Sequence, residues 1–129
     1  PDRIPDAVEE LLRYFPAFAY MRRTATRDVE LHGQVIREGD KVAFWYVSSN
    51  RDERVYDDPQ RLDVARRPQH QAFGAGGRHF CLGAALARLE LRILLEETLD
   101  RLPRLALGGS PTRTRSTFLN QFKSLPVTC

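Results

Sequence analysis

Residues 73–88 read FGAGGRHFCLGAALAR, and the interpretation of the whole chain starts from this stretch. Its first half is rich in glycine, and Gly76 and Gly77 leave the backbone open to close approach. Its second half begins an apolar helical pattern. Cys81 stands between the two halves, where the unpaired N–H groups and the dipole of a helix start favour the thiolate. The stretch therefore predicts a cysteine that is held as a thiolate at the beginning of a helix.

Several kinds of site are compatible with a single thiolate. A zinc site is not among them, because it needs three or four protein ligands. Cys81 could act alone as the axial ligand of a haem iron, or it could be a small buried apolar residue. A phosphate-binding loop is a further alternative, although the Lys-Ser/Thr ending of such loops is missing. A disulfide with Cys129 is not expected, because that cysteine is the last residue of the chain.

Periodicity around this stretch predicts short elements. A helix is expected over residues 6–14, with Asp6, or Pro5 together with Asp6, as its cap and Pro16 beyond its end. A long helix with two apolar faces, and therefore buried on two sides, is expected over residues 82–102. The remaining expectations are an antiparallel unit of short strands (29–31, 34–36 and 41–46), a short polar helix within 47–55, an ordered irregular loop over 57–71 and a final pair of strands within 117–127.

Composition narrows the class of protein. The 129 residues hold 42% hydrophobic and 29% charged residues, and the net charge is +3, which suits one domain and does not favour nucleic-acid binding. The longest apolar run, residues 42–47, is far too short to span a bilayer, and no leader opens the chain. We therefore expect a cytoplasmic protein with no membrane anchor. The start at Pro1, already close to a helix, suggests a piece of a larger fold.

Three motifs in the same order resemble the bacterial cytochrome P-450 family. Residues 73–88 resemble its cysteine-ligand loop and the following helix, residues 10–13 (ELLR) its Glu-x-x-Arg helix, and residues 58–62 (DPQRL) its meander segment. The resemblance covers almost all 129 residues. It implies a mainly α fold with small antiparallel β-sheets, here the C-terminal portion of a single catalytic domain.

By this resemblance, Cys81 is the proximal ligand of haem b, and its electron donation favours O–O cleavage of the co-substrate O2. Arg23 and His79 match residues that pair with the haem propionates, although a strand-edge arginine and a loop histidine are the plain alternatives. The other residues assigned to the cofactor are Phe73, Gly74, Leu82 and Gly83.

Glu10 and Arg13 lie three residues apart on one helix face. On their own they predict only a surface ion pair. By resemblance they form a buried cluster with Arg61 that holds the meander and the cysteine loop in place. Such a cluster is structural and not catalytic.

The resemblance also suggests the substrate class. Family members line the substrate pocket with segments that correspond here to Ala17, Phe18, Ala19, Phe118 and Leu119, all apolar, although core packing would explain them equally. The interval from Phe73 to Cys81 is one residue longer than in most bacterial members. This loop and residues 22–28 resemble actinobacterial members that oxidise steroids, methyl-branched lipids or fatty acids.

The resemblance implies a monooxygenase that receives electrons from a ferredoxin and its reductase. Exposed arginines, Arg66, Arg67, Arg78 and Arg88, could receive an acidic ferredoxin. Family members also use a long helix on the distal side of the haem, where an acidic residue next to a threonine takes part in oxygen activation. No such pair precedes Glu10 in this sequence, so the 129 residues alone are expected to be inactive and poorly folded. A non-enzymatic haem sensor and a cofactor-free interaction module are the alternatives.

Overall fold

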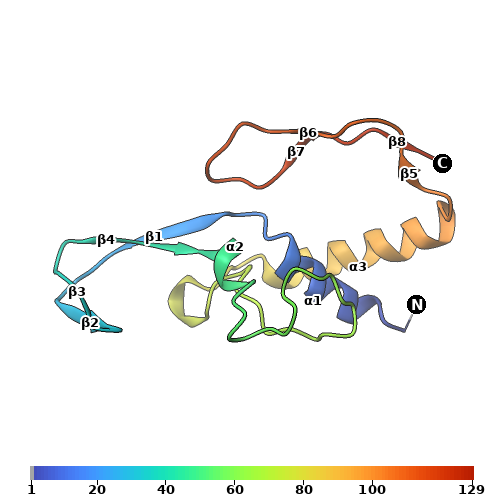
Figure 1. Cartoon of the computed structure of the whole chain (residues 1–129). Coiled ribbons are helices and arrows are strands. Elements are labelled where there is room, and N and C mark those ends of the chain that lie inside the picture. Colours follow the sequence, from blue (N-terminus) through green and yellow to red (C-terminus); the bar gives the residue numbers. More distant parts are fainter. Residues whose placement is uncertain (1) are drawn as a thin grey trace.

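Two helices in contact form the centre of the molecule, which we describe from a computed structural model over residues 2–129 (Figure 1). Helix α1 spans Ile4–Tyr14 and helix α3 spans Ala84–Arg101. A single turn, α2 (Tyr46–Ser49), and a short 3-10 helix, η1 (Gly77–His79), complete the helices. Helices α1 and α3 lie far apart in the sequence, and their contact brings the two segments together.

Helix α1 begins earlier than its sequence pattern predicts. Pro5 stands in its first turn, where a missing N–H does no harm. The predicted cap by Asp6 is wrong, because the residue before the helix is Arg3 and the Asp6 carboxylate instead pairs with Arg67 at 3.1 Å. At the other end, the N–H of Phe15 closes the last turn, and Pro16 follows as predicted.

The middle of the chain forms two small antiparallel pairs. Strand β1 (Tyr20–Thr24) pairs with β4 (Lys41–Trp45), and β2 (Val29–Leu31) pairs with β3 (Gln34–Ile36). The three predicted strands are confirmed to within one residue. Strand β1 was not predicted, because its sequence YMRRT lacks the alternation of polar and apolar residues.

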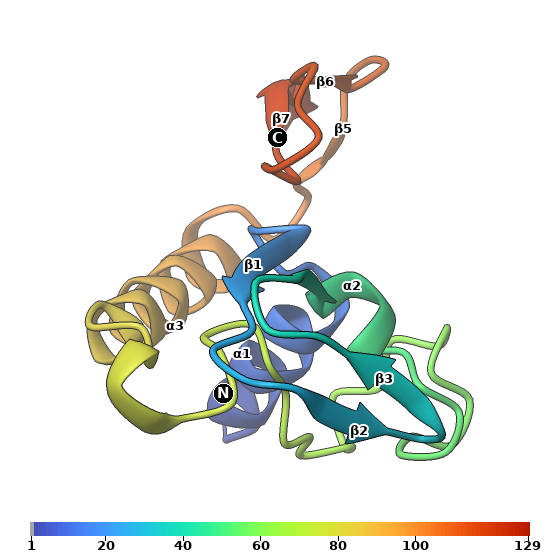
Figure 2. The same ribbon diagram turned by 90° about the vertical axis from the view of Figure 1, so that its left-hand side faces the viewer.

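The C-terminal region holds two further pairs in place of the single pair predicted. Strand β5 (Ala106–Leu107) pairs with β8 (Val127–Thr128), and β6 (Thr112–Arg113) pairs with β7 (Phe122–Ser124). These strands stand apart from the helices at the end of α3 (Figure 2). The loop between β6 and β7 returns to the rest of the chain through a β-bridge from Leu119 to Phe18.

Helix α3 is covered on one side only. Ala84 at its start is buried, but most of its large apolar side chains are exposed, Leu99 to 63%. The prediction of burial on two sides is therefore wrong for residues 2–129, where the helix packed against α3 is α1. No helix among these residues is long and apolar enough to cross a membrane.

The fully buried centre of the molecule is small and polar. Its apolar members are Ile4, Val8, Tyr56 and Ala84. Its largest fully buried side chains are Arg13, Glu10, Asn50 and Pro16. The two helices and the small antiparallel sheets confirm the predicted fold class. The buried polar side chains mark the region where hydrogen-bond partners must be placed most accurately.

Candidate functional site

Cys81 lies between η1 and α3, on the loop that precedes the long helix. Its backbone N–H donates a hydrogen bond to the carbonyl oxygen of Phe73 (3.0 Å), and its own carbonyl accepts from Ala84 (3.2 Å). The thiol is free and exposed, and so is that of Cys129, so residues 2–129 contain no disulfide. The interpretation of Cys81 as a small buried apolar residue is therefore wrong.

Glycines shape the loop around this thiol. Gly74, Gly76 and Gly77 have φ angles of 90°, 98° and 75°, in the left-handed region that other residues avoid. A Cβ at Gly83 would lie 3.9 Å from the Cys81 Sγ, so the glycine keeps one side of the sulfur open. The loop can thus pass close to a flat group without a side chain in between.

The thiol faces a cavity of about 600 Å³, within the range of roughly 300–1,000 Å³ that small-molecule and cofactor sites occupy. Its walls are mostly apolar and come from α1, the start of β1, the cysteine loop and α3. The lining residues are Leu12, Ala17, Phe18, Met21, Arg23, Tyr46, Ala72, Phe73, Gly74, His79, Cys81, Gly83 and Ala87.

Two cationic or potentially cationic residues lie on the wall of this cavity. Arg23 and His79 also line a neighbouring hollow of about 230 Å³, together with Tyr46 and Gly74. Both side chains are exposed, and neither is ion-paired with an acidic residue in the part of the chain described; Arg23 donates only to the Arg22 carbonyl (3.0 Å). The structure thus brings the Arg23 guanidinium and the His79 imidazole to one cavity, where both can donate hydrogen bonds to an anionic ligand.

Other sequence-predicted residues divide between this cavity and its surroundings. Ala17 and Phe18 line it, whereas Ala19 and Leu119 line a separate cavity of about 250 Å³. The Phe118 ring packs on Phe18 with centroids 5.0 Å apart. Leu82 does not line the cavity, and its side chain is fully exposed to solvent. The prediction for Leu82 and Gly83 concerns their backbone N–H groups, so it does not depend on that side chain.

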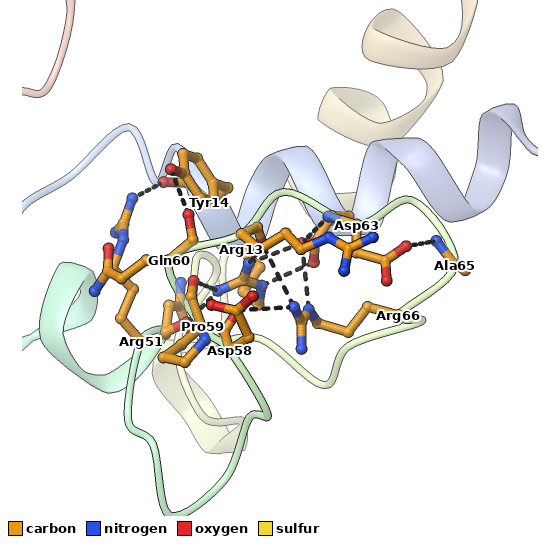
Figure 3. A network of polar contacts seen from close by, with 12 residues as sticks. Arg13, Tyr14, Arg51, Asp58, Pro59, Gln60, Asp63, Ala65 and Arg66 are labelled. Atoms are coloured by element: carbon orange, nitrogen blue, oxygen red, sulfur yellow. Dashed lines mark hydrogen bonds and ion pairs between the residues drawn. The ribbon is translucent and has the colours of Figure 1, made fainter.

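Glu10 and Arg13 form a buried ion pair, and Figure 3 shows the network of polar contacts around Arg13. The Arg13 Nε and Nη2 donate to the two carboxylate oxygens at 2.8 and 2.7 Å, and neither side chain is exposed at all. A surface ion pair is therefore the wrong description. Burial disfavours the charged carboxylate, but hydrogen bonds from Arg13 and from the Asp63 N–H leave the pKa of Glu10 below its ordinary value.

The remaining donors of Arg13 fasten the irregular segment 57–71. Its guanidinium donates to the carbonyl oxygens of Asn50 (2.8 Å), Pro59 (2.9 Å) and Arg61 (3.2 Å). Three backbone carbonyls from two segments thus converge on one side chain. This loop has no regular backbone pairing of its own. Arg13 therefore supplies hydrogen-bond donors to carbonyl oxygens that a neighbouring strand would otherwise have to satisfy.

The second arginine of the cluster is Arg66 and not Arg61. Arg66 Nε lies 3.3 Å from a Glu10 oxygen, and its other nitrogens donate to the carbonyls of Asp57, Asp58 and Arg61. Arg61 contributes only its carbonyl, and its residue is exposed. The DPQRL motif therefore predicted the right segment and the wrong side chain, because the turn after Pro59 directs a later arginine inward.

A second network was not predicted. Glu9 accepts hydrogen bonds from Arg88 and meets His70 at 3.0 Å. Arg66 and Arg88 are thus committed to Glu10 and Glu9, which corrects the expectation that both present free charge to a ferredoxin. The only sequence signal was the doubled glutamate at the start of the Glu-x-x-Arg helix.

The sequence pattern of the cytochrome P-450 family matches residues 4–121. The chain belongs to this family. The match includes the cysteine loop, both glutamates of α1 and the irregular segment that they hold, so the predicted family is confirmed.

Two similar proteins are named as oxygenases of a methyl-branched lipid and of linalool. The chain is 48% identical to the methyl-branched lipid omega-hydroxylase of Mycobacterium tuberculosis, over 96% of this chain and 29% of that protein. It is 44% identical to linalool 8-monooxygenase of Pseudomonas putida, over 98% and 31%. A solved Mycobacterium marinum cytochrome P-450 in complex with pseudoionone superposes with a TM-score of 0.94 at 46% identity, over 99% of this chain and 31% of that one. The chain thus spans about a third of the length of its relatives.

Proposed function

We propose that these 129 residues are the C-terminal, haem-ligating part of a cytochrome P-450 monooxygenase, with Cys81 as the proximal ligand of haem b. The observation that carries this proposal is the free thiol at the start of α3, on the wall of an apolar cavity of about 600 Å³. A single thiolate is one of the axial ligands of haem iron, and no group of three His, Cys, Asp or Glu residues among residues 2–129 offers an alternative metal site.

The donor set fits this cofactor. An apolar wall suits a flat porphyrin, and Arg23 with His79 supplies cationic partners for its two carboxylates. Gly74 and Gly83 keep the backbone near the sulfur open. Bound haem would supply the activation of O2 and the insertion of one oxygen atom into a substrate.

The chain's own residues prepare this ligand. Helix α3 begins at Ala84, so the positive end of its dipole lies next to Cys81. The N–H of Cys81 is held by Phe73, so the loop cannot rotate freely about the sulfur-bearing residue. Glu10, Arg13 and Arg66 fix segment 57–71, and they act on the site through the backbone.

The apolar walls support a lipophilic substrate such as a steroid or a fatty acid. Ala17 and Phe18, just after α1, lie on the same cavity as the thiol, and Phe118 packs on Phe18. The names of the relatives, among them a steroid C26-monooxygenase of Mycolicibacterium smegmatis at 43% identity, are consistent with this class.

The isolated chain is proposed to be inactive, because family members place the oxygen-activating helix in a part that these residues do not contain. The exposed apolar face of α3 supports this view, since such a face normally has a partner. Purified residues 1–129, loaded with haem, should therefore form no oxygenated product from a lipophilic substrate in the presence of O2 and an electron donor. Substrate-dependent product formation by this chain alone would contradict the proposal.

Electrons are proposed to come from a ferredoxin and its reductase in the cytoplasm, where a ligand thiol stays reduced. Arg78, on the cysteine loop, is exposed and unpaired among the described residues. Arg78→Glu should slow reduction and weaken its salt dependence, whereas Arg27→Glu, in an exposed turn distant in sequence, should not. Equal effects of both variants would exclude a docking role for Arg78.

The ligand assignment is tested by Cys81→Ser in the full-length protein that carries this sequence, with Cys129→Ser as the matched control. The reduced carbon-monoxide complex should show a thiolate-type absorption band in the parent and in the control, and lose it in Cys81→Ser. Persistence of the band would overturn the assignment. Haem binding without product formation from any lipid would indicate a sensor, and no haem uptake would indicate a cofactor-free module.

A further inference from the structure

Glu9 is the centre of a second polar network that links three distant segments. Both Nε and Nη2 of Arg88 donate to its carboxylate, at 2.7 and 2.9 Å, which is the bidentate geometry of a strong ion pair. His70 Nε2 lies 3.0 Å from the second carboxylate oxygen. The hydrogen bond from Arg88 is the largest influence that holds the pKa of Glu9 below its ordinary value. Glu9 therefore ties α1 to α3 and to the segment before the cysteine loop.

The hydrogen bonds fix the tautomer of His70. The backbone N–H of Ala72 donates to Nδ1 at 3.2 Å, so Nδ1 is the acceptor and the proton lies on Nε2, which donates to Glu9. The His70 side chain is only 2% exposed. The imidazole thus joins the carboxylate on one side to the backbone immediately before Phe73 on the other.

The network converges on the Phe73 ring. The Arg88 guanidinium lies over this ring, 4.7 Å from its centroid, and the His70 ring lies 5.8 Å away. Phe73 in turn accepts the backbone N–H of Cys81 through its carbonyl and lines the cavity beside the thiol. An unbroken series of contacts therefore runs from Glu9, through His70 and Arg88, to Phe73 and the backbone of Cys81.

We propose that Glu9 is a positioning residue for the cysteine ligand, acting through His70 and Arg88 on Phe73. This inference rests on the proposed role of Cys81 and adds a residue to it. Glu10, the next residue of α1, instead faces segment 57–71, and its contacts include neither Phe73 nor Cys81. The two adjacent glutamates thus have different partners: Glu10 bonds Asp63 and Arg66 within the irregular segment, whereas Glu9 bonds His70 at the end of that segment and Arg88, which both lie against Phe73.

The first test needs no cofactor. Amide hydrogen exchange at Cys81 reports the opening of its bond to Phe73, so Glu9→Gln should raise that exchange rate by roughly tenfold, the factor expected when one charged hydrogen-bond partner is weakened. Glu96→Gln is the matched control, because it removes an exposed ion pair to Arg92 on α3, the helix that also carries Arg88. An unchanged rate at Cys81 in folded Glu9→Gln would overturn the proposal.

A second pair of variants separates positioning from general loss of stability. If Glu9 acts through the ring of Phe73, Glu9→Gln should accelerate exchange at Cys81 much less in a Phe73→Leu background than in the parent. Equal acceleration in both backgrounds would show that Glu9 does not act through Phe73. Arg88→Lys, which keeps the charge and loses the bidentate fork, serves in the same comparison should Glu9→Gln fail to fold.

The haem-loaded, full-length protein distinguishes the two proposals. Glu9→Gln should retain haem but shift its reduction potential and diminish the thiolate-type band of the carbon-monoxide complex, with Glu96→Gln unchanged. If the band of the parent persists in Cys81→Ser, the ligand assignment fails, and the hydrogen-exchange result still decides what Glu9 does to the loop. If Cys81→Ser loses the band but Glu9→Gln shifts neither the potential nor the exchange rate, only the role of Glu9 fails.

Discussion

Arg66 Nε lies 3.3 Å from the Glu10 carboxylate across 56 residues of sequence, and it is this arginine that completes the buried cluster. Its side chain is 13% exposed, whereas Glu10 is fully buried. The same guanidinium also donates to the carbonyls of Asp57 and Asp58, so it closes the turn around Pro59 as well as neutralising Glu10. A meander segment with no regular structure is thus held by two arginine side chains, Arg13 and Arg66, that donate to its backbone carbonyls.

Arg66→Ala should lower the free energy of unfolding by about 1–3 kcal/mol, because it removes one charged partner of a buried carboxylate. Arg61→Ala should change it by less than about 0.5 kcal/mol, since only the carbonyl of that residue is used. Urea unfolding of the two variants gives the comparison directly. A larger loss in Arg61→Ala would restore the original assignment from the DPQRL motif.

Arg13→Lys should destabilise the protein by about 2–3 kcal/mol although the charge is kept. An ammonium cannot reach both Glu10 oxygens and the carbonyls of Asn50 and Pro59 together, so buried acceptors lose their donors. Arg54→Lys is the control, because its pair with Asp52 is largely exposed on the arginine side. If Arg13→Lys and Arg54→Lys unfold at similar urea concentrations, the planar guanidinium of Arg13 is not needed for stability.

Stability should fall as the pH drops below about 6.5. Burial lowers the pKa of His70 in the folded protein, whereas the unfolded chain takes up the proton near the ordinary value of 6.5. The unfolded state therefore binds more protons in acid, and the contribution of neutral His70 is complete only above that pH. Unfolding free energies measured between pH 5 and 8 should show this slope.

His70→Gln should flatten that slope, since glutamine does not titrate. His32→Asn provides the comparison, because it removes a histidine from the exposed turn between β2 and β3 and should keep the slope of the parent. The same slope in His70→Gln would mean that another group is responsible.

Gly76→Ala should cost about 1–3 kcal/mol through the backbone alone, because φ is 98° at this position and an added Cβ would touch nothing within 4 Å. Gly83→Ala, with an ordinary φ and a contact of 3.9 Å to the Cys81 sulfur, should cost less than about 1 kcal/mol. Thermal unfolding ranks the two variants. The reverse ranking would indicate that the loop relaxes around Gly76.

The sequence predicted what depends on local pattern. The helices α1 and α3, the strands β2, β3 and β4 and the cysteine loop follow from periodicity, proline and glycine, and the family followed from three motifs. Strand β1 was not predicted, because its two adjacent arginines break the alternation of polar and apolar residues. Its pairing with β4 joins residues that lie far apart in the sequence.

Side-chain partners were harder to predict than elements. Arg66 follows Arg61 by five positions in an irregular segment, where no helical or strand period indicates which arginine faces Glu10. Similarly, Glu9 and Arg88 are 79 residues apart, so no local rule could pair them. The cavity wall, by contrast, was largely anticipated, since Arg23, His79, Ala17 and Phe18 all reach it.

The separations of 79 residues between Glu9 and Arg88 and 56 between Glu10 and Arg66 also bear on how the chain folds. Contacts between such distant residues require large loops to close before they release any free energy, and chains rich in them fold slowly. The pocket beside Cys81 has walls from α1, β1 and α3, so it is complete only when these distant segments have met. Binding of a cofactor against all of these walls would then require closure of the same long loops.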